Sequence, residues 1–318
     1  PSPPEWIPGG ACTGRAKPLG EPPITGGQGG MQGRKAIGER LMRILITGAG
    51  GFVGGWLAEA LAAAYPTATL FGTVHGAGEP RAGATPIPGD LSDAQAAANA
   101  IAISQPTHVF HLAGYASAAG LDEEAISRAN VTATTAPLDA LKERGEPCRV
   151  LLASSAYAYG PTPEHPAKES DPLDPRGPYA TSKVEMEKAV RSYASEALPL
   201  TIVRAFNHTG PRQRTGFAVP DWASQLVAIE QGEAEPLLRH GNLGSIRDFL
   251  DVRDVVEAYR LLLCEIEQAP WRVVNVCSGR GVTMQSVLSG LIAATRVSVR
   301  TEVDQSRWRD DAWANVGD

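Results

Sequence analysis

The stretch RILITGAGGFVG, residues 43–54, decides the fold of this chain, because it joins a short apolar strand to a helix through a glycine-rich turn. Gly48, Gly51 and Gly54 follow the spacing G-x-x-G-x-x-G. The first glycine permits a tight turn, the second lets the backbone approach a pyrophosphate, and the third allows the helix to pack closely on the strand. Amide groups at the helix start would then face the anion. The stretch predicts a dinucleotide site, rather than a mere tight connection, with contacts at Gly48, Gly51, Phe52, Val53 and Gly54.

Short apolar strands alternate with helical segments downstream of this turn. Further strands are expected at about 68–74, 107–112, 149–154 and 200–204, with a helix at 179–195 before the last. The alternation predicts an α/β fold with a doubly wound parallel sheet, the Rossmann arrangement, covered by helices on both faces. We expect a dinucleotide-binding domain at 42–205, to which 245–278 returns. A smaller C-terminal substrate-binding lobe would then consist of 206–244 and 279–318.

Residues 1–41 differ from the rest of the chain, because proline and glycine crowd this segment without apolar periodicity. Such a segment cannot bury enough surface to offset the entropy of ordering, so we expect disorder. It also lacks the apolar central run of a signal peptide. Our hypothesis is that the residues before Met42 come from an overlong start assignment, which the intact mass of the native protein would test.

The overall composition excludes several classes of function. The formal net charge of −6 gives no electrostatic case for nucleic acid or an anionic membrane, and no apolar run is long enough to span a bilayer. The four cysteines form no CxxC pair and no zinc-site spacing; they are Cys12, Cys148, Cys264 and Cys277. We therefore expect a cytoplasmic protein with reduced thiols and no metal site.

A tyrosine and a lysine four residues apart are the candidate catalytic pair. Tyr179 and Lys183 share one face of the predicted helix. A neighbouring ammonium favours the phenolate, so Lys183 is expected to lower the pKa of Tyr179 and make it a usable acid and base. Such a pair is common by chance on solvated helix faces. The paired serines that end the strand at 149–154 supply the context that favours chemistry here.

Together these motifs resemble the extended branch of the short-chain dehydrogenase/reductases, the NAD-dependent epimerase/dehydratase family, over residues 42–303. The resemblance implies that Ser155, five residues before Gly160, hydrogen-bonds the reacting oxygen, and that Lys183 also holds the nicotinamide ribose. Ser155, Tyr179 and Lys183 are therefore the predicted catalytic set. The resemblance also implies a homodimer formed through helices at about 121–144 and 177–196.

The same resemblance assigns the remaining cofactor contacts. The end of the second strand carries no acid to hold a ribose 2′-hydroxyl, whereas Arg81 could pair with a 2′-phosphate or be a solvated surface arginine. NADP is therefore slightly favoured over NAD. Asp90 and Leu91 lie in the expected adenine-contacting turn, although Asp93 could simply cap the next helix. A further strand end would lie beneath the ribose at Leu112, Ala113 and Gly114.

Two segments resemble the substrate side of the family. In the first, 204–212, Asn207 and Arg212 would contact a nucleotide sugar, although a turn at Gly210-Pro211 is the simpler reading. The second, 241–254, matches the branch that handles GDP-linked hexoses and adds Asn242 and Arg247. The planar fork of Arg247 suits a pyrophosphate or ribose. Other charged residues in this segment are expected to form a structural ion-pair network.

The reaction type follows from what stands before Gly160. Dehydratases of this branch carry a glutamate three residues before the glycine, often beside an aspartate, and here these positions are Tyr157 and Ala156. A dehydratase is thus disfavoured. The leading prediction is NAD(P)H-dependent reduction of the C4 ketone of a GDP-linked 4-keto-6-deoxyhexose, as in GDP-4-keto-6-deoxymannose reductases. A 4-epimerase and a non-catalytic nucleotide-binding protein are the alternatives. Related chains usually continue further, so we expect a truncated substrate lobe.

Overall fold

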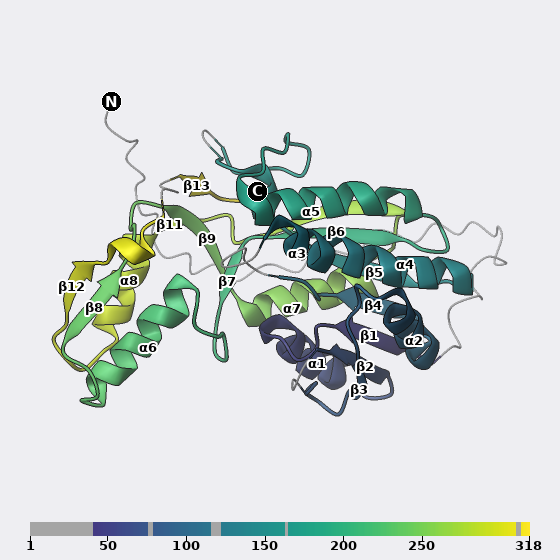
Figure 1. Ribbon diagram of the computed structural model, residues 1–318, viewed down its shortest axis with the longest axis horizontal. Helices are drawn as coiled ribbons and strands as arrows, with labels where there is room; N and C mark the ends of the chain where they lie inside the picture. The colour runs from purple at the N-terminus through teal and green to yellow at the C-terminus, as the bar shows by residue number, and fades with distance from the viewer. Residues whose placement is uncertain (1–40, 76–78, 116–121, 163–164, 310–312) are drawn as a thin grey trace, which may run out of the picture. The chain divides into compact units, whose positions relative to one another are not determined.

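A sheet of seven parallel strands organises the protein (Figure 1). The computed structural model describes residues 41–75, 79–115, 122–162, 165–309 and 313–318, so the disorder expected at 1–41 falls, apart from Leu41, outside the described residues. The strand order is β10-β6-β5-β4-β1-β2-β3. The strands are β1 (Arg43–Thr47), β2 (Thr69–Val74), β3 (Thr85–Pro88), β4 (His108–His111), β5 (Arg149–Ser155), β6 (Leu200–Ala205) and β10 (Trp271–Val276).

Helices cover both faces of this sheet, because successive apolar residues of each strand point to opposite sides. Leu45 of β1 joins a core shared with α2 and α4, whereas its neighbours Ile44 and Ile46 join a second core shared with α1 and α7. This arrangement confirms the predicted doubly wound α/β fold. The helices are α1 (Phe52–Ala64), α2 (Ala94–Ser104), α3 (Glu123–Ser127), α4 (Ala133–Arg144), α5 (Gly177–Val190) and α7 (Val252–Arg260).

A smaller lobe is built from later parts of the chain. Strand β9 (Ile246–Asp251) pairs with β7 (Asn207–Thr209), β11 (Gly281–Thr283) and β13 (Ala314–Asn315), and β8 (Leu237–His240) pairs with β12 (Arg300–Val303). Helices α6 (Ala218–Glu230) and α8 (Met284–Ala293) enclose a small core with β8. Of the segment 245–278, β9 thus belongs to the smaller lobe, while β10 joins the large sheet and α7 packs against a face of that sheet.

Short irregular turns complete the described chain. They are 3₁₀ turns at Ala156–Tyr159, Arg191–Tyr193 and Gln305–Arg307, and π-helical turns at Arg128–Thr132 and Leu261–Glu265. Every helix within the described ranges is too short or too polar to cross a membrane. The thiols of Cys148, Cys264 and Cys277 are free, and Cys12 lies outside the described residues.

Candidate active site

A cavity of about 320 Å³ lies at the carboxyl ends of β1, β2 and β4. The strand order reverses here, since β2 lies on one side of β1 and β4 on the other. Such a switch point is where open α/β sheets bind their ligands. Five residues that the sequence predicted as cofactor contacts line the cavity: Gly48, Asp90, Leu91, Ala113 and Gly114.

The glycine turn leaves the space that a dinucleotide requires. Gly48 adopts a φ of +69°, and its carbonyl accepts the amide of Gly51 at 2.9 Å. Gly51 is the N-cap of α1 and offers no side chain to the first amides of that helix. A Cβ on Gly54 would lie 2.3 Å from the carbonyl oxygen of Gly48. A close backbone approach and a helix N-terminus without a side-chain cap therefore meet at this turn, which fits a bound pyrophosphate.

Substituting Gly54 tests how tightly the turn is packed. We expect Gly54→Ala to lower the free energy of unfolding by about 1–3 kcal/mol, because an extra methyl in a packed interface forces the backbone to move. The same movement of the backbone should weaken NADPH binding. Urea denaturation and cofactor fluorescence titration measure the two effects. Gly55→Ala is the matched control, since its Cβ would meet the flexible side chain of Arg81. An equal loss of stability and of NADPH affinity in the two variants would contradict the prediction.

The cavity also contains a carboxylate that is held in place by hydrogen bonds. Asp90 Oδ1 accepts the amide of Ser92 at 2.9 Å and its hydroxyl at 2.8 Å, and these bonds lower the pKa of Asp90. His75 follows β2 and lines the cavity, at the place where an NAD-specific protein would carry an acid. Asp93 caps α2, since its Oδ1 accepts the amide of Ala96 at 2.8 Å.

The two arginines near the cofactor turn are placed differently. Arg81, predicted to pair with a 2′-phosphate, is not among the residues that line the cavity; its side chain lies over Gly55 and 3.8 Å from the Glu59 carboxylate. Arg128 does line the cavity. Sequence reasoning missed Arg128, because nothing in its neighbours distinguishes it from a solvated helix residue.

The candidate catalytic side chains lie on β5 and α5. Ser155 ends β5, and its side chain lies close enough to the phenol of Tyr179 on α5 to lower the pKa of that phenol. The Ser155 Oγ also accepts the amide of Tyr157 at 3.2 Å. Lys183 lies one turn along α5 from Tyr179 and donates from Nζ to the carbonyl oxygen of Ala153 at 2.9 Å. The hydroxyl, phenol and ammonium that the sequence predicted thus lie on adjacent elements.

Burial controls the protonation of this set. It raises the pKa of Tyr179, although the neighbouring Ser155 side chain acts in the opposite direction. The sequence predicted a lowered pKa, and this was wrong for the protein alone, because the Lys183 ammonium is bonded to Ala153 and burial outweighs the favourable effects. Burial also lowers the pKa of Lys183 to about 8, while the charge of Glu187 raises it.

A buried ion pair lies one helical turn along α5 from Lys183. Arg204 of β6 holds Glu187 of α5 through Nη2–Oε2 at 2.7 Å and Nε–Oε1 at 3.1 Å, and both side chains are 7% exposed. Ser154 donates to Glu187 Oε1 at 2.5 Å, and Arg204 also donates to the Tyr159 hydroxyl at 3.0 Å. These bonds join α5 to β5 and β6, and so they fix the helix that carries Tyr179 and Lys183.

Asn130 links the cofactor cavity to the catalytic helix, and sequence reasoning missed it. Its side chain is buried in the π-helical turn between α3 and α4. Its Oδ1 accepts the amide of Tyr115 at 3.0 Å, and its Nδ2 donates to Ser182 Oγ at 2.9 Å. Ser182 in turn donates to the carbonyl oxygen of Tyr179 at 2.8 Å. The regular 3.6-residue period of a helix does not reveal such a turn.

The four predicted substrate contacts are not gathered at one point. Asn207 of β7 has a buried Oδ1 without a hydrogen-bond partner in the described part of the chain. Arg212 lies over the ring of Trp56 on α1 at 4.0 Å and pairs with Glu59 at 2.8 Å. Two others lie in the smaller lobe: Asn242 bonds the Gly244 amide and the Arg309 carbonyl, and Arg247 is only 3% exposed.

Comparison with known proteins gives the family. Residues 44–277 match the NAD dependent epimerase/dehydratase family. The chain belongs to this family. It is 32% identical over 272 residues to GDP-6-deoxy-D-mannose reductase of Pseudomonas aeruginosa, covering 84% of each chain. The membership confirms the resemblance that the sequence motifs predicted.

Solved structures agree with this placement in the epimerase/dehydratase family. RMD from Pseudomonas aeruginosa complexed with NADPH is 30% identical, with a TM-score of 0.71 over 87% of this chain and 90% of that one. UDP-glucose 4-epimerase of Thermus thermophilus in complex with NAD is 28% identical, with a TM-score of 0.72 over 87% and 90%. The fold therefore matches family members crystallised with either nicotinamide cofactor.

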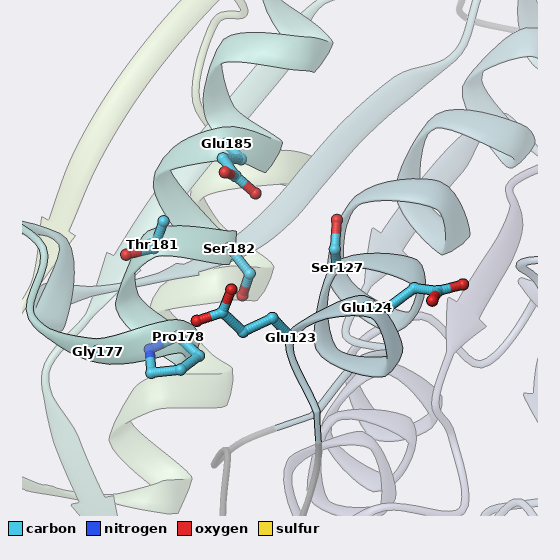
Figure 2. Close-up of a pocket in the computed structure, with 8 residues that line it drawn as sticks. All are labelled: Glu123, Glu124, Ser127, Gly177, Pro178, Thr181, Ser182 and Glu185. Atoms are coloured by element: carbon cyan, nitrogen blue, oxygen red, sulfur yellow. The ribbon is translucent and has the colours of Figure 1, made fainter.

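This family member has a second cavity, of about 500 Å³, between α3 and α5. Figure 2 shows Glu123 of α3 extending toward Pro178 and Ser182 of α5. Glu124 and Glu185 also line this cavity, so its walls are acidic. An acidic lining repels phosphate groups. The cavity at the glycine turn therefore suits a phosphate-bearing ligand better than this one does.

Proposed function

We propose that the protein is an NAD(P)H-dependent reductase of the C4 ketone of a GDP-linked 4-keto-6-deoxyhexose. The proposal rests on the proximity of the Ser155 side chain to the Tyr179 phenol, with Lys183 on the same helix as Tyr179. Ser155 lies on β5, which is the neighbour of β4 in the sheet. The carboxyl end of β4 borders the proposed cofactor cavity. The likeness to GDP-6-deoxy-D-mannose reductase supports the choice of sugar.

The proposed roles follow from the chemistry of each side chain. When bound, the reduced nicotinamide supplies the hydride. Tyr179 donates its phenolic proton to the oxygen of the reacting carbonyl as negative charge develops there. Ser155 accepts the Tyr157 amide, so its own proton is left to stabilise the same oxygen. The ammonium of Lys183 favours the tyrosinate that remains and orients the cofactor ribose.

The proposed cofactor contacts favour NADP slightly. The turn at Gly48, Gly51 and Gly54, with the amides of Phe52 and Val53, would hold the pyrophosphate. Asp90 would accept from the adenine, with Leu91 against the ring and 112–114 beneath a ribose. His75 and Arg128 line the adenosine end and both act to lower the pKa of Asp90, so that end has basic character. A basic end suits a 2′-phosphate better than an acidic one would.

On the substrate side, we propose contacts from Asn207, Arg212, Asn242 and Arg247. The strongest support is for Asn207, because a buried acceptor without a partner costs free energy unless a ligand supplies a donor. The proposed substrate part is 206–244 with 279–318, and the cofactor part is 42–205 with the returning segment 245–278. Within the latter, β9 pairs with strands of the smaller lobe.

A direct assay tests the reductase. Purified protein is mixed with GDP-4-keto-6-deoxymannose, and the absorbance of NADPH or NADH is followed at 340 nm. We expect the absorbance to fall, faster with NADPH, and GDP-6-deoxymannose to form. Bound cofactor without consumption of either reductant would contradict the proposal and favour a non-catalytic nucleotide-binding protein.

A 4-epimerase is the second candidate, because UDP-glucose 4-epimerase of Thermus thermophilus shares the fold at 28% identity. An epimerase reoxidises the cofactor that it reduces, so it would retain NAD through purification. Mass spectrometry of the denatured, freshly purified protein distinguishes the two. A dehydratase is disfavoured, since Ala156 and Tyr157 carry no carboxylate at the positions where dehydratases have one.

We also propose that the protein is a cytoplasmic homodimer, with α3, α4 and α5 of each copy in contact. Light scattering during gel filtration should give twice the mass of one chain. A monomer at micromolar concentration would contradict this assembly.

The pH dependence of reduction tests the role of Lys183. We expect kcat to fall as the pH rises through about 8, because the pKa of Lys183 lies there and the ammonium is the working form. Glu187→Gln should move this decline to lower pH, since the Glu187 charge raises the pKa of Lys183. Glu185→Gln, on the exposed side of the same helix, is the matched control and should leave the profile unchanged. A flat profile between pH 6 and about 10 would count against the role.

A further inference from the structure

An aromatic cluster lies beside the catalytic phenol. The ring of Tyr157 is edge-on to that of Tyr179, with centroids 6.4 Å apart and planes at 72°. Trp313 meets the other side of Tyr157 at 5.9 Å and 82°. All three side chains are half-buried, so each keeps some accessible surface. The three aromatic rings therefore form one cluster that runs from Tyr179 to Trp313, the residue before β13.

The cluster is held from both lobes. The Arg247 guanidinium lies 4.6 Å from the Trp313 ring and 6.0 Å from the Tyr157 ring, and its Nη1 donates to the carbonyl of Ile246 at 3.0 Å. Strand β13, which follows Trp313, pairs with β9. Its Asn315 donates to the carbonyl of Ala156 at 3.1 Å, in the turn that contains Tyr157. The aromatic surface is therefore part of the fixed structure around the catalytic turn.

The position of Tyr157 determines which part of a substrate it meets. A carbonyl oxygen bonded to Ser155 and Tyr179 places the reacting carbon against both residues. Tyr157 lies two residues after Ser155, gives it an amide hydrogen bond and contacts the Tyr179 ring. The sugar-ring carbons on either side of the reacting carbon thus lie nearest to Tyr157.

The two flanks of a C4 ketone differ in polarity. C3 carries a hydroxyl group, whereas C5 carries C6, which is a methyl group in a 6-deoxy sugar. A hydroxyl against an aromatic surface loses hydrogen bonds to water, and a methyl group there gains from leaving water. The C5–C6 side of the sugar therefore fits the aromatic surface better than the C3 side does.

We propose that Tyr157 and Trp313 form an apolar contact surface for C5 and C6 of the substrate and select a 6-deoxyhexose over its 6-hydroxy counterpart. The inference rests on the proposed function and extends it, because it assigns a source of sugar specificity. Arg247 acts in this arrangement as the brace of the Trp313 ring.

The test compares two sugars in the oxidation direction. The values of kcat/KM with NADP⁺ are measured for GDP-6-deoxymannose and GDP-mannose, and their ratio defines the selectivity. Where oxidation of GDP-mannose is too slow to detect, the selectivity is instead the ratio of the inhibition constant of GDP-mannose to that of GDP-6-deoxymannose, both measured against GDP-4-keto-6-deoxymannose. We expect the ratio to favour the 6-deoxy sugar by about 10-fold or more. This is the usual discrimination between two substrates that differ by one small group bound in a hydrophobic pocket.

Variants then locate the source of the selectivity. Tyr157→Ser and Trp313→Leu should each reduce the ratio by several-fold, whereas Tyr157→Phe, which keeps the ring, should retain it. Trp308→Ala is the matched control, because Trp308 is an exposed tryptophan outside the cluster. Two independent variants keep the test decisive if one fails to fold.

The outcomes separate this inference from the function on which it rests. An unchanged ratio in an active Tyr157→Ser or Trp313→Leu protein overturns the inference and leaves the reductase intact. A wild-type protein that binds NADP⁺, oxidises neither sugar and consumes no NADPH with GDP-4-keto-6-deoxymannose overturns the proposed function and the inference together. A loss of selectivity in Trp308→Ala as large as in the cluster variants would also overturn it.

Discussion

Replacing Tyr179 with phenylalanine lowers kcat for ketone reduction by about 10²–10⁴-fold, the usual contribution of a positioned general acid. The substitution removes the phenolic hydroxyl, which lies near Ser155, but keeps the ring. Tyr179 supplies the phenol beside Ser155, so in the variant the proton would have to come from water. NADPH binding should change little, because the glycine turn is untouched. Stopped-flow absorbance and cofactor fluorescence measure the two effects.

Tyr193→Phe is the matched control for this experiment. Tyr193 follows the same helix, and its hydroxyl donates to Asp139 at 2.7 Å, away from Ser155. The same atom is removed without touching the candidate catalytic set. Full turnover of Tyr179→Phe, or an equal loss in Tyr193→Phe, would refute the role assigned to Tyr179.

Arg204→Met should lower the free energy of unfolding by about 3–5 kcal/mol, the usual effect of removing one partner of a buried pair. The carboxylate of Glu187 would stay buried with only Ser154 as a donor, and the Tyr159 hydroxyl would lose its guanidinium. Methionine fills a similar volume, so the lost charge, and not a cavity, dominates the change. Urea denaturation followed by circular dichroism measures it.

An exposed ion pair provides the comparison. Arg239 lies 3.5 Å from Glu235, and their side chains are 50% and 63% exposed. Arg239→Met should cost less than about 1 kcal/mol, because water and salt screen such pairs. If both arginine variants lose the same stability, the Glu187–Arg204 pair does not hold the catalytic helix in the way proposed. Arg204→Met should also reduce kcat at temperatures where it remains folded, since α5 is anchored through this pair.

Most of the large sheet was predictable, because its strands are buried on both faces and appear as apolar runs. β5 and β6 begin at the predicted residues, and each extends one residue further than predicted. Strand β3 was not predicted, since its sequence TPIP contains two prolines, which lack amide donors. Its position at the sheet edge, beside β2 alone, explains why the prolines are tolerated.

Residue types and their spacing along the chain were sufficient to predict the glycine turn, the Tyr179–Lys183 pair on one helix and the position of Ser155 at a strand end. Each of these depends on residues a few positions apart, within one strand, one turn or one helix. The pKa of Tyr179 could not be predicted in this way, because its sign depends on how completely the neighbouring elements bury the phenol. For the same reason, the direction in which Lys183 points was not predictable from its spacing.

Contacts between distant segments decided the rest. Arg247 and Trp313 lie far apart in sequence and meet only because β9 and β13 pair. Asn130 reaches Ser182 through a π-helical turn, and Arg128, rather than Arg81, lines the cofactor cavity. Strand pairing and side-chain burial are cooperative properties of the whole fold, and so the amino acids on either side of each residue do not specify them.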